Sequence, residues 1–237
     1  MPRKGRAPNA LRAVTIERGY TINPDGSVLV CFGDTRVLCT AVVESKVPGW
    51  LLGKGRGWVT AEYAMLPGSA SEGRISRDSV RGGRALEISR LIGRSLRSVV
   101  DLAALGEIQV TVDCDVIQAD GGTRTAAITG GYIALHDALT KAVSQGTVKK
   151  LPITAQCAAV SVGIVGGETM LDLCYEEDSS ADVDLNLVMR NDDTIIEVQG
   201  TAERVPFRRD GLDAMIDLGR EGILQLFARQ REALGLV

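Results

Sequence analysis

The segment from Ile108 to Val143 constrains the fold of this chain more than any other. Apolar and polar residues alternate from 108 to 117, which is the period of a strand with one buried face. Asp120-Gly-Gly-Thr-Arg124 follows, and then a helix that we predict over 125–143. Its internal glycines cost about 1 kcal/mol each relative to alanine, so close packing must compensate. The pattern therefore predicts a strand, a tight turn and a closely packed helix.

Further strands and helices are predicted on both sides of this segment, from β-branched runs and from apolar residues at helical spacing. They are hairpins over 27–43 and 157–175, strands over 58–65, 182–189 and 194–199, and helices over 84–100 and 212–227. The polar stretch 144–154 is the best break in the chain. We therefore expect an α+β fold in a single domain, 1–237, with two internal halves at 1–145 and 155–237.

Composition excludes several classes of protein. The chain has 237 residues, of which 45% are hydrophobic and 24% charged, and it contains no long uncharged apolar run. Its N-terminus lacks the apolar stretch of a secretory signal, so we expect a cytoplasmic protein without a membrane segment. Five cysteines without a Cys-x-x-Cys pair indicate buried, reduced thiols rather than disulfides or zinc. The single histidine, His136, is expected to be structural.

Charge is unevenly distributed, although the net charge is only −3. Four arginines and a lysine lie in the segment 3–18, and a second group of arginines lies between residues 74 and 97. The second group begins in a stretch rich in Gly, Ser and Arg, 67–83, that we expect to be an exposed loop. Five carboxylates lie between Glu176 and Asp184. If these basic segments contact nucleic-acid phosphates, that binding should weaken as salt is raised.

The turn Gly121–Arg124 is a candidate anion site. It lies where a strand ends and a helix begins, so that unpaired backbone N–H groups and the positive helix end would face a ligand. Gly122 allows close approach, Thr123 adds a hydroxyl and Arg124 adds a guanidinium that matches phosphate. Gly82-Gly83-Arg84 opens a second helix in the same way, and the two ends could share one phosphate. The alternative at each place is an exposed arginine beside an ordinary helix start.

The acidic stretch 176–184 is a candidate metal site. Carboxylates close to a phosphate-binding site would repel the substrate unless they hold a divalent cation, and Mg²⁺ or Mn²⁺ prefers oxygen ligands. The alternative is a solvated acidic loop.

Five motifs together resemble bacterial ribonuclease PH over about residues 5–234. They are Gly26-Ser-Val-Leu-Val, Val37-Leu-Cys-Thr-Ala, Gly57-Trp-Val-Thr-Ala-Glu-Tyr-Ala-Met-Leu-Pro67, Asp113-Cys-Asp-Val-Ile-Gln-Ala-Asp-Gly-Gly-Thr-Arg-Thr-Ala-Ala127 and Ile196-Glu-Val-Gln-Gly-Thr-Ala202. The resemblance implies a ribonuclease PH-like fold: a duplicated βαβ-type module with mixed sheets packed against helices. It also implies a phosphorolytic 3′-to-5′ exoribonuclease, or tRNA nucleotidyltransferase, that trims tRNA precursors and other RNA 3′ ends, releases nucleoside diphosphates and can add nucleotides in reverse.

The same resemblance implies roles for particular residues and an assembly. Inorganic phosphate is the co-substrate, bound by Arg84, Gly122, Thr123 and Arg124, and Asp178 and Asp184 are the catalytic, metal-associated carboxylates. Arg74 and Arg77 are candidates for tRNA contacts, in a loop where Gly68 replaces the family's usual arginine. The implied assembly is a homohexamer, a trimer of dimers, with neither DNA nor membrane as partner. Two alternatives are a non-catalytic RNA-binding ring subunit and a metabolite phosphotransferase.

Overall fold

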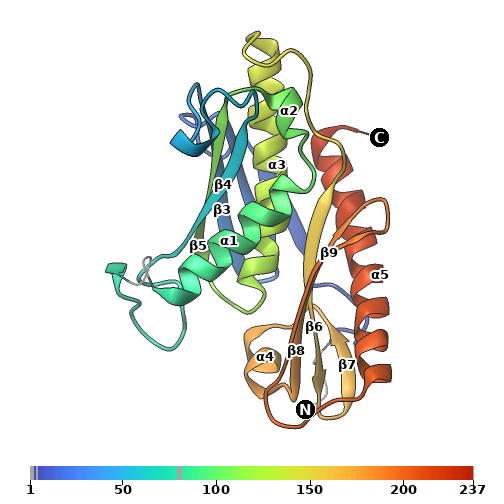
Figure 1. The fold of residues 1–237 in the computed structure, drawn as a ribbon. Coiled ribbons are helices and arrows are strands. Elements are labelled where there is room, and N and C mark those ends of the chain that lie inside the picture. The colour runs from blue at the N-terminus through green and yellow to red at the C-terminus, as the bar shows by residue number, and fades with distance from the viewer. Residues whose placement is uncertain (1–2, 4, 79–81, 237) are drawn as a thin grey trace.

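Two β-sheets and the helices packed on them form the structure, a computed structural model that describes residues 3, 5–78 and 82–236 (Figure 1). In spatial order the first sheet consists of β1 (Val14–Arg18), β2 (Gly26–Phe32), β3 (Thr35–Glu44), β5 (Gln109–Gln118) and β4 (Trp58–Met65). Only β4 and β5 run parallel, because a crossover through α1 (Gly83–Arg97) and the short α2 (Leu102–Leu105) connects them. A 3₁₀ turn, Gly49–Leu51, precedes β4.

The second sheet is antiparallel throughout. Its spatial order is β7 (Glu168–Leu171), β6 (Cys157–Val165), β8 (Val183–Arg190) and β9 (Ile195–Ala202). Two helices complete this half of the chain, α4 (Tyr175–Ser180) and α5 (Arg209–Leu234). The mixed pairing that the sequence predicted for the sheets is therefore confined to the first sheet.

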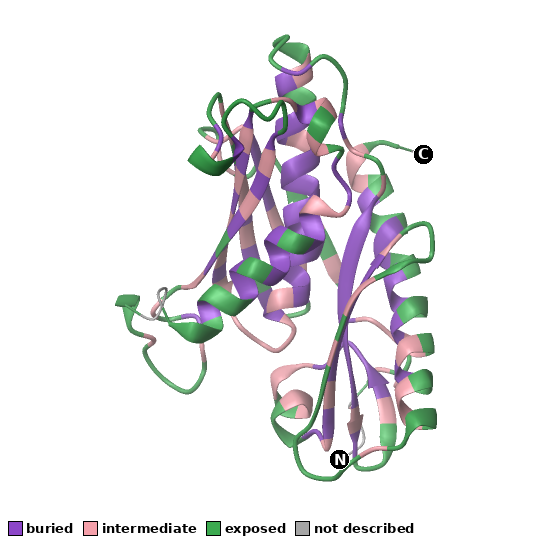
Figure 2. Cartoon of the chain, in the orientation of Figure 1, coloured by how far each residue is buried: buried purple, intermediate pink, exposed green. Residues whose placement is uncertain are grey.

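The long helix α3 (Thr123–Ser144) lies between the two sheets and is buried along most of its length (Figure 2). On one side Gly130 packs on β2, where a Cβ would lie 2.5 Å from Val30 Cγ1. On the other side the Thr129 hydroxyl donates to the Ala159 carbonyl of β6 at 3.3 Å. Helix α5 covers the opposite face of the second sheet, so β6 is buried on both faces. The predicted close packing of this small-residue helix is confirmed.

The predicted strand at 108–117 and the helix that follows it are confirmed as β5 and α3. Several elements differ from the prediction. Strand β1 and helix α2 were not predicted, and β7 ends at Leu171 rather than continuing to residue 175. Asp172, with φ of 54°, turns the chain out of the sheet, and a helical turn begins at Tyr175. The acidic segment that was predicted as a strand end and loop is therefore partly helical.

All five cysteines are free, as predicted, but Cys31 and Cys174 are only half-buried. None of the helices in the described ranges is both long and apolar enough to cross a membrane.

Candidate functional site

The turn before α3 adopts the backbone conformation that its glycines permit. Gly121 and Gly122 both have left-handed φ, 72° and 63°. A Cβ at Gly121 would lie 2.5 Å from the Leu173 carbonyl oxygen, so the close approach of the second half requires glycine there. Gly122 is the N-cap of α3 and offers no capping side chain. The first N–H groups of α3 therefore remain available to a ligand at the positive end of the helix.

The second predicted helix start faces the same space. Arg84 lies in the first turn of α1, and Arg124 lies in the first turn of α3. Both arginines line two adjoining cavities between the halves of the molecule. Gly122 and Thr123 line the first of these cavities. The structure thus brings together all four residues predicted to bind phosphate, although they come from separate segments of the sequence.

Asp178 of α4 and Asp184 of β8 line both cavities opposite the arginines. Burial, only partly offset by Arg124 and Arg84, raises the pKa of Asp178. Burial and the neighbouring Asp178 carboxylate raise the pKa of Asp184 to about 6. Two crowded, half-buried carboxylates are an environment in which a cation would stabilise the charged forms.

The described residues contain no group of three or more His, Cys, Asp or Glu side chains that could hold a metal ion. A divalent cation at Asp178 and Asp184 would therefore take its remaining ligands from water and from substrate oxygens. Mg²⁺ is commonly bound in this way, through one or two carboxylates and phosphate oxygens. The two aspartates fit such an ion.

Four contacts near the turn involve residues that the sequence did not single out. The Arg124 guanidinium donates to Gln199 Oε1 of β9 at 2.7 Å, and Gln199 Nε2 donates to Glu87 Oε1 of α1 at 2.7 Å. The hydroxyls of Tyr63 and Thr123 lie 2.8 Å apart in a buried contact. Asn186 Nδ2 donates to Asp184 Oδ2 at 3.3 Å. The first three contacts join residues at least 60 positions apart in the sequence, so local patterns could not reveal them.

The loop that follows β4 contributes to the first cavity through Ala70, Ser71 and Glu72. Glu72 accepts a hydrogen bond from the Tyr175 hydroxyl, which attaches the loop to α4. Arg74 and Arg77, the predicted RNA contacts, are exposed further along the same loop. Residues 79–81, including Arg81 of the basic stretch, lie outside the described residues.

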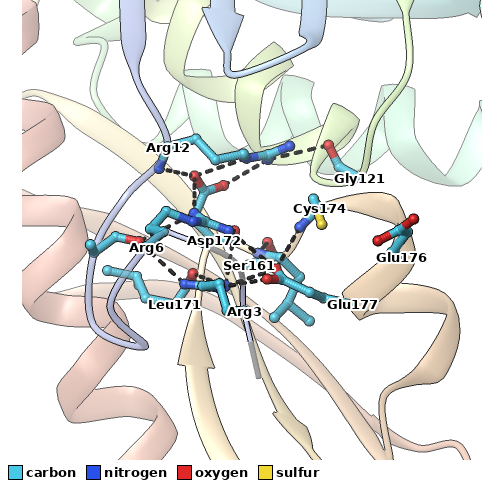
Figure 3. A network of polar contacts seen from close by, with 12 residues as sticks. Arg3, Arg6, Arg12, Gly121, Ser161, Leu171, Asp172, Cys174, Glu176 and Glu177 are labelled. Carbon is cyan, nitrogen blue, oxygen red and sulfur yellow. Dashed lines mark hydrogen bonds and ion pairs between the residues drawn. The ribbon is translucent and has the colours of Figure 1, made fainter. Parts of the chain in front are cut away.

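The N-terminal arginines form internal ion pairs rather than a free basic surface (Figure 3). Arg3 Nε lies 2.6 Å from Glu177 Oε1, Arg12 Nη2 lies 2.7 Å from Asp172 Oδ1, and Arg6 contacts both carboxylates. The hypothesis that this segment contacts RNA phosphates is therefore not supported for these three arginines, because they already form ion pairs with Asp172 and Glu177 of the second half. Lys4 lies outside the described residues.

His136 is buried on α3, and burial lowers its pKa. Its Nδ1 atom lies 3.4 Å from the hydroxyl of Thr140, one turn later on the same helix. This environment supports the structural role expected for it.

Two family signatures match the chain. The 3′ exoribonuclease family, domain 1, RNase PH, matches residues 10–141, and domain 2 of the same family matches residues 155–222. The chain belongs to this family. The boundary between the two matches falls in the connection from α3 to β6, so that the family's first domain supplies the glycine turn and its second domain supplies the aspartates.

Three solved structures share the fold of this chain over most of its length. The chain is similar to rice (Oryza sativa) Rrp46, with a TM-score of 0.78 and 20% identity over 97% of this chain and 98% of that one. It is also similar to a chain of the Archaeoglobus fulgidus exosome with RNA bound to the active site, with a TM-score of 0.79 and 22% identity over 95% and 91%. A chain of an archaeal exosome core gives 0.73 and 21% over 96% and 89%. These likenesses confirm the predicted fold, an RNase PH-like α+β architecture with sheets packed against helices.

Proposed function

We propose that this protein is a phosphate-dependent 3′-to-5′ exoribonuclease that trims the 3′ ends of tRNA precursors, as bacterial ribonuclease PH does. One observation carries the proposal: two helix starts with Arg84 and Arg124 face the same cavity as Asp178 and Asp184. The arginines and the N–H groups of the turn suit a small anion, while the carboxylates suit a divalent cation that would balance the charge of a second phosphate, that of the RNA.

In this proposal, inorganic phosphate is the attacking reagent. Arg84, Thr123, Arg124 and the Gly122 backbone hold it, and one of its oxygens forms a bond to the last phosphodiester phosphorus of the RNA. The bond from that phosphorus to the 3′ oxygen breaks, which releases a nucleoside diphosphate, and the shortened RNA keeps its 3′ hydroxyl after taking up a proton. Because a phosphoanhydride replaces a phosphodiester, the step is reversible, and excess nucleoside diphosphate extends RNA.

Asp178 and Asp184 would hold Mg²⁺ or Mn²⁺, whose charge would stabilise the phosphate oxygens during transfer. The protein itself contributes positioning and a proton source. A carboxyl group of this site would protonate the leaving 3′ oxygen.

Recognition of RNA in this proposal depends on the backbone. Aromatic residues make up only 4% of the chain, so base stacking is a minor contribution and sequence preference is weak. The exposed Arg74 and Arg77 are placed to contact a longer substrate such as a tRNA precursor. We further propose that the protein works in the cytoplasm as a homohexamer, a trimer of dimers.

A non-catalytic RNA-binding subunit of an exosome-like ring is the second candidate, and its basis is the fold shared with exosome chains. What favours catalysis is that five side chains suited to it, Arg84, Thr123, Arg124, Asp178 and Asp184, lie on one pair of cavities. A binding subunit has no need of this combination.

The assay uses the full chain, RNA, Mg²⁺ and ³²P-labelled inorganic phosphate. We expect label to enter nucleoside diphosphates as the RNA shortens. Arg84→Ala and Arg124→Ala should each reduce turnover about a hundredfold or more while RNA binding largely persists. Arg209→Ala, which changes an exposed arginine at the start of α5, is the control. Release of unlabelled nucleoside monophosphates would contradict phosphorolysis, and RNA binding without shortening would favour the ring subunit.

A further inference from the structure

The glycine turn is held from its rear side by side chains that do not themselves line the phosphate cavity. Arg12, which precedes β1, lies with Gly33, Asp34 and Asp120 along a separate cavity on that side. A Cβ at Gly122 would lie 3.0 Å from Arg12 Nη2, which measures how closely the guanidinium packs under the turn.

Arg12 binds two consecutive carbonyl groups of the turn. Its Nη1 donates to the Asp120 carbonyl, and its Nη2 lies 3.4 Å from the Gly121 carbonyl oxygen (Figure 3). Thr35, at the start of β3, adds a second anchor: its hydroxyl donates to the Gly121 carbonyl at 2.6 Å and accepts from the Asp120 N–H at 3.0 Å. The orientation of both peptide groups is thus set from behind.

This orientation determines where the N–H groups point. The described peptide bonds are trans, so each carbonyl and the N–H of the next residue point in opposite directions. When Arg12 and Thr35 hold the carbonyls of Asp120 and Gly121 on the rear side, the N–H groups of Gly121 and Gly122 turn toward the front, where these two glycines line the first cavity. Left-handed glycines are otherwise free to rotate these groups away.

Arg12 is itself fixed by the second half of the chain. Its Nε and Nη2 donate to the two oxygens of Asp172 at 3.0 and 2.7 Å, and its backbone N–H donates to Asp172 Oδ2 at 2.8 Å. Asp172 is completely buried. A bidentate pair of this kind has one geometry, which lysine cannot reproduce.

We propose that Arg12, together with Thr35, is a positioning residue for phosphate: it turns the N–H groups of the glycine turn into the cavity and ties that orientation to Asp172 of the second half. The inference rests on the proposed function, because it assigns the anion at the turn as inorganic phosphate. It predicts that phosphate affinity depends on two residues that never touch phosphate.

The test compares matched arginine variants. Arg12→Lys keeps a charge for Asp172 but loses the fork that reaches both carbonyls. Arg18→Lys is the control, since Arg18 also binds an aspartate, Asp137, through Nε and Nη2 and a backbone carbonyl through Nη1, but far from the turn. Thr35→Val removes the hydroxyl from the turn and leaves the buried Arg12–Asp172 pair intact, so it decides the matter if Arg12→Lys does not fold. Thr35→Ser restores the hydroxyl.

Two readouts separate positioning from general stability. One is the rise in Tm with added inorganic phosphate, which reports binding without turnover, and the other is the set of KM for phosphate, KM for RNA and kcat. Arg12→Lys and Thr35→Val should each raise the Kd for phosphate from the Tm shift, and the KM for phosphate, by about tenfold. The KM for RNA should stay nearly unchanged. Arg18→Lys and Thr35→Ser should retain wild-type phosphate affinity, whatever their Tm.

The outcomes also distinguish this inference from the proposed function. If wild-type protein shows phosphorolysis and Arg12→Lys and Thr35→Val lower only the Tm, Arg12 is merely structural and the inference is overturned. If wild-type protein binds phosphate without phosphorolysis and the two variants lose that binding, the inference holds and the proposed function fails. If phosphate does not stabilise wild-type protein at all, the turn is not a phosphate site and the inference fails.

Discussion

Replacing Tyr63 with phenylalanine tests whether the Thr123 hydroxyl is oriented for a bound phosphate. Tyr63 lies on β4 with 2% of its surface exposed, and its hydroxyl is 2.8 Å from Thr123 Oγ1. A threonine hydroxyl has one hydrogen. If Thr123 donates that hydrogen to phosphate, Tyr63 must be the donor in the tyrosine–threonine bond. Burial raises the pKa of Tyr63, so the phenol keeps its hydrogen near neutral pH.

The expected magnitude follows from the loss of one neutral, buried hydrogen bond. Such a bond contributes about 1 kcal/mol, which corresponds to a phosphate KM raised about fivefold if the whole contribution is expressed on binding. The same loss should lower the Tm by about 3 °C for a chain of this length. The kcat at saturating phosphate should change less, because Tyr63 does not contact the RNA in the proposed arrangement.

The assay measures phosphorolysis at varied phosphate and the phosphate-dependent shift in Tm for wild type, Tyr63→Phe, Thr123→Val and the double variant. Tyr132→Phe is the control. Tyr132 is also buried, but it lies on α3 about 13 Å from Thr123 along the helix axis. Tyr63 and Thr123 should be coupled, so that the double variant is little worse than Thr123→Val. A phosphate KM unchanged by Tyr63→Phe but raised by Thr123→Val would refute this reasoning.

Two further predictions concern charge and packing. Because burial and Asp178 raise the folded-state pKa of Asp184 from 3.8 to about 6, its ionised form destabilises the metal-free protein by roughly 3 kcal/mol at most above pH 6. This cost declines as the pH falls below 6 and is lost below the unfolded pKa of 3.8. In EDTA, the Tm advantage of Asp184→Asn should therefore shrink between pH 7.5 and 5, and a constant difference would exclude this titration. Gly130→Ala should destabilise the protein by about 1–3 kcal/mol because its Cβ would meet Val30 at 2.5 Å, whereas at Gly131 the nearest atom lies 3.5 Å away, so Gly131→Ala should be tolerated; equal unfolding free energies for the two variants would contradict this packing.

Local patterns in the sequence were sufficient for the centre of the site. Three signals each operate within a few residues: the alternation in β5, the glycines after it and the small residues of α3. They correspond to a strand with alternating burial, a glycine at the start of α3 and a closely packed helix. The convergence of Arg84 and Arg124 was foreseen only as a possibility, because two helix starts in separate segments meet through the parallel pairing of β4 and β5.

Helix α4 illustrates what local patterns cannot supply. It has six residues, none of them buried, so it carries no hydrophobic periodicity. Its start depends on a cap: the Glu177 carboxylate accepts from the Cys174 N–H at 2.9 Å, and cysteine is not among the residues usually favoured there. Glu177 is in turn fixed by Arg3, 174 residues away in the sequence. The position of Asp178 therefore depends on contacts that only the folded chain contains.

The partner of Arg124 suggests how one site keeps opposite charges apart until a substrate arrives. The first half supplies Arg84, Arg124 and the helix starts, and the second half supplies Asp178 and Asp184 in the same cavities. Arg124 donates to the neutral amide of Gln199 at 2.7 Å. A bond to a neutral acceptor is weaker than a charge-assisted pair with a carboxylate, so the phosphate of the proposed reaction would displace it at lower cost. Because Gln199 also donates to Glu87, its amide oxygen stays directed at Arg124, and the guanidinium is held in place without being neutralised.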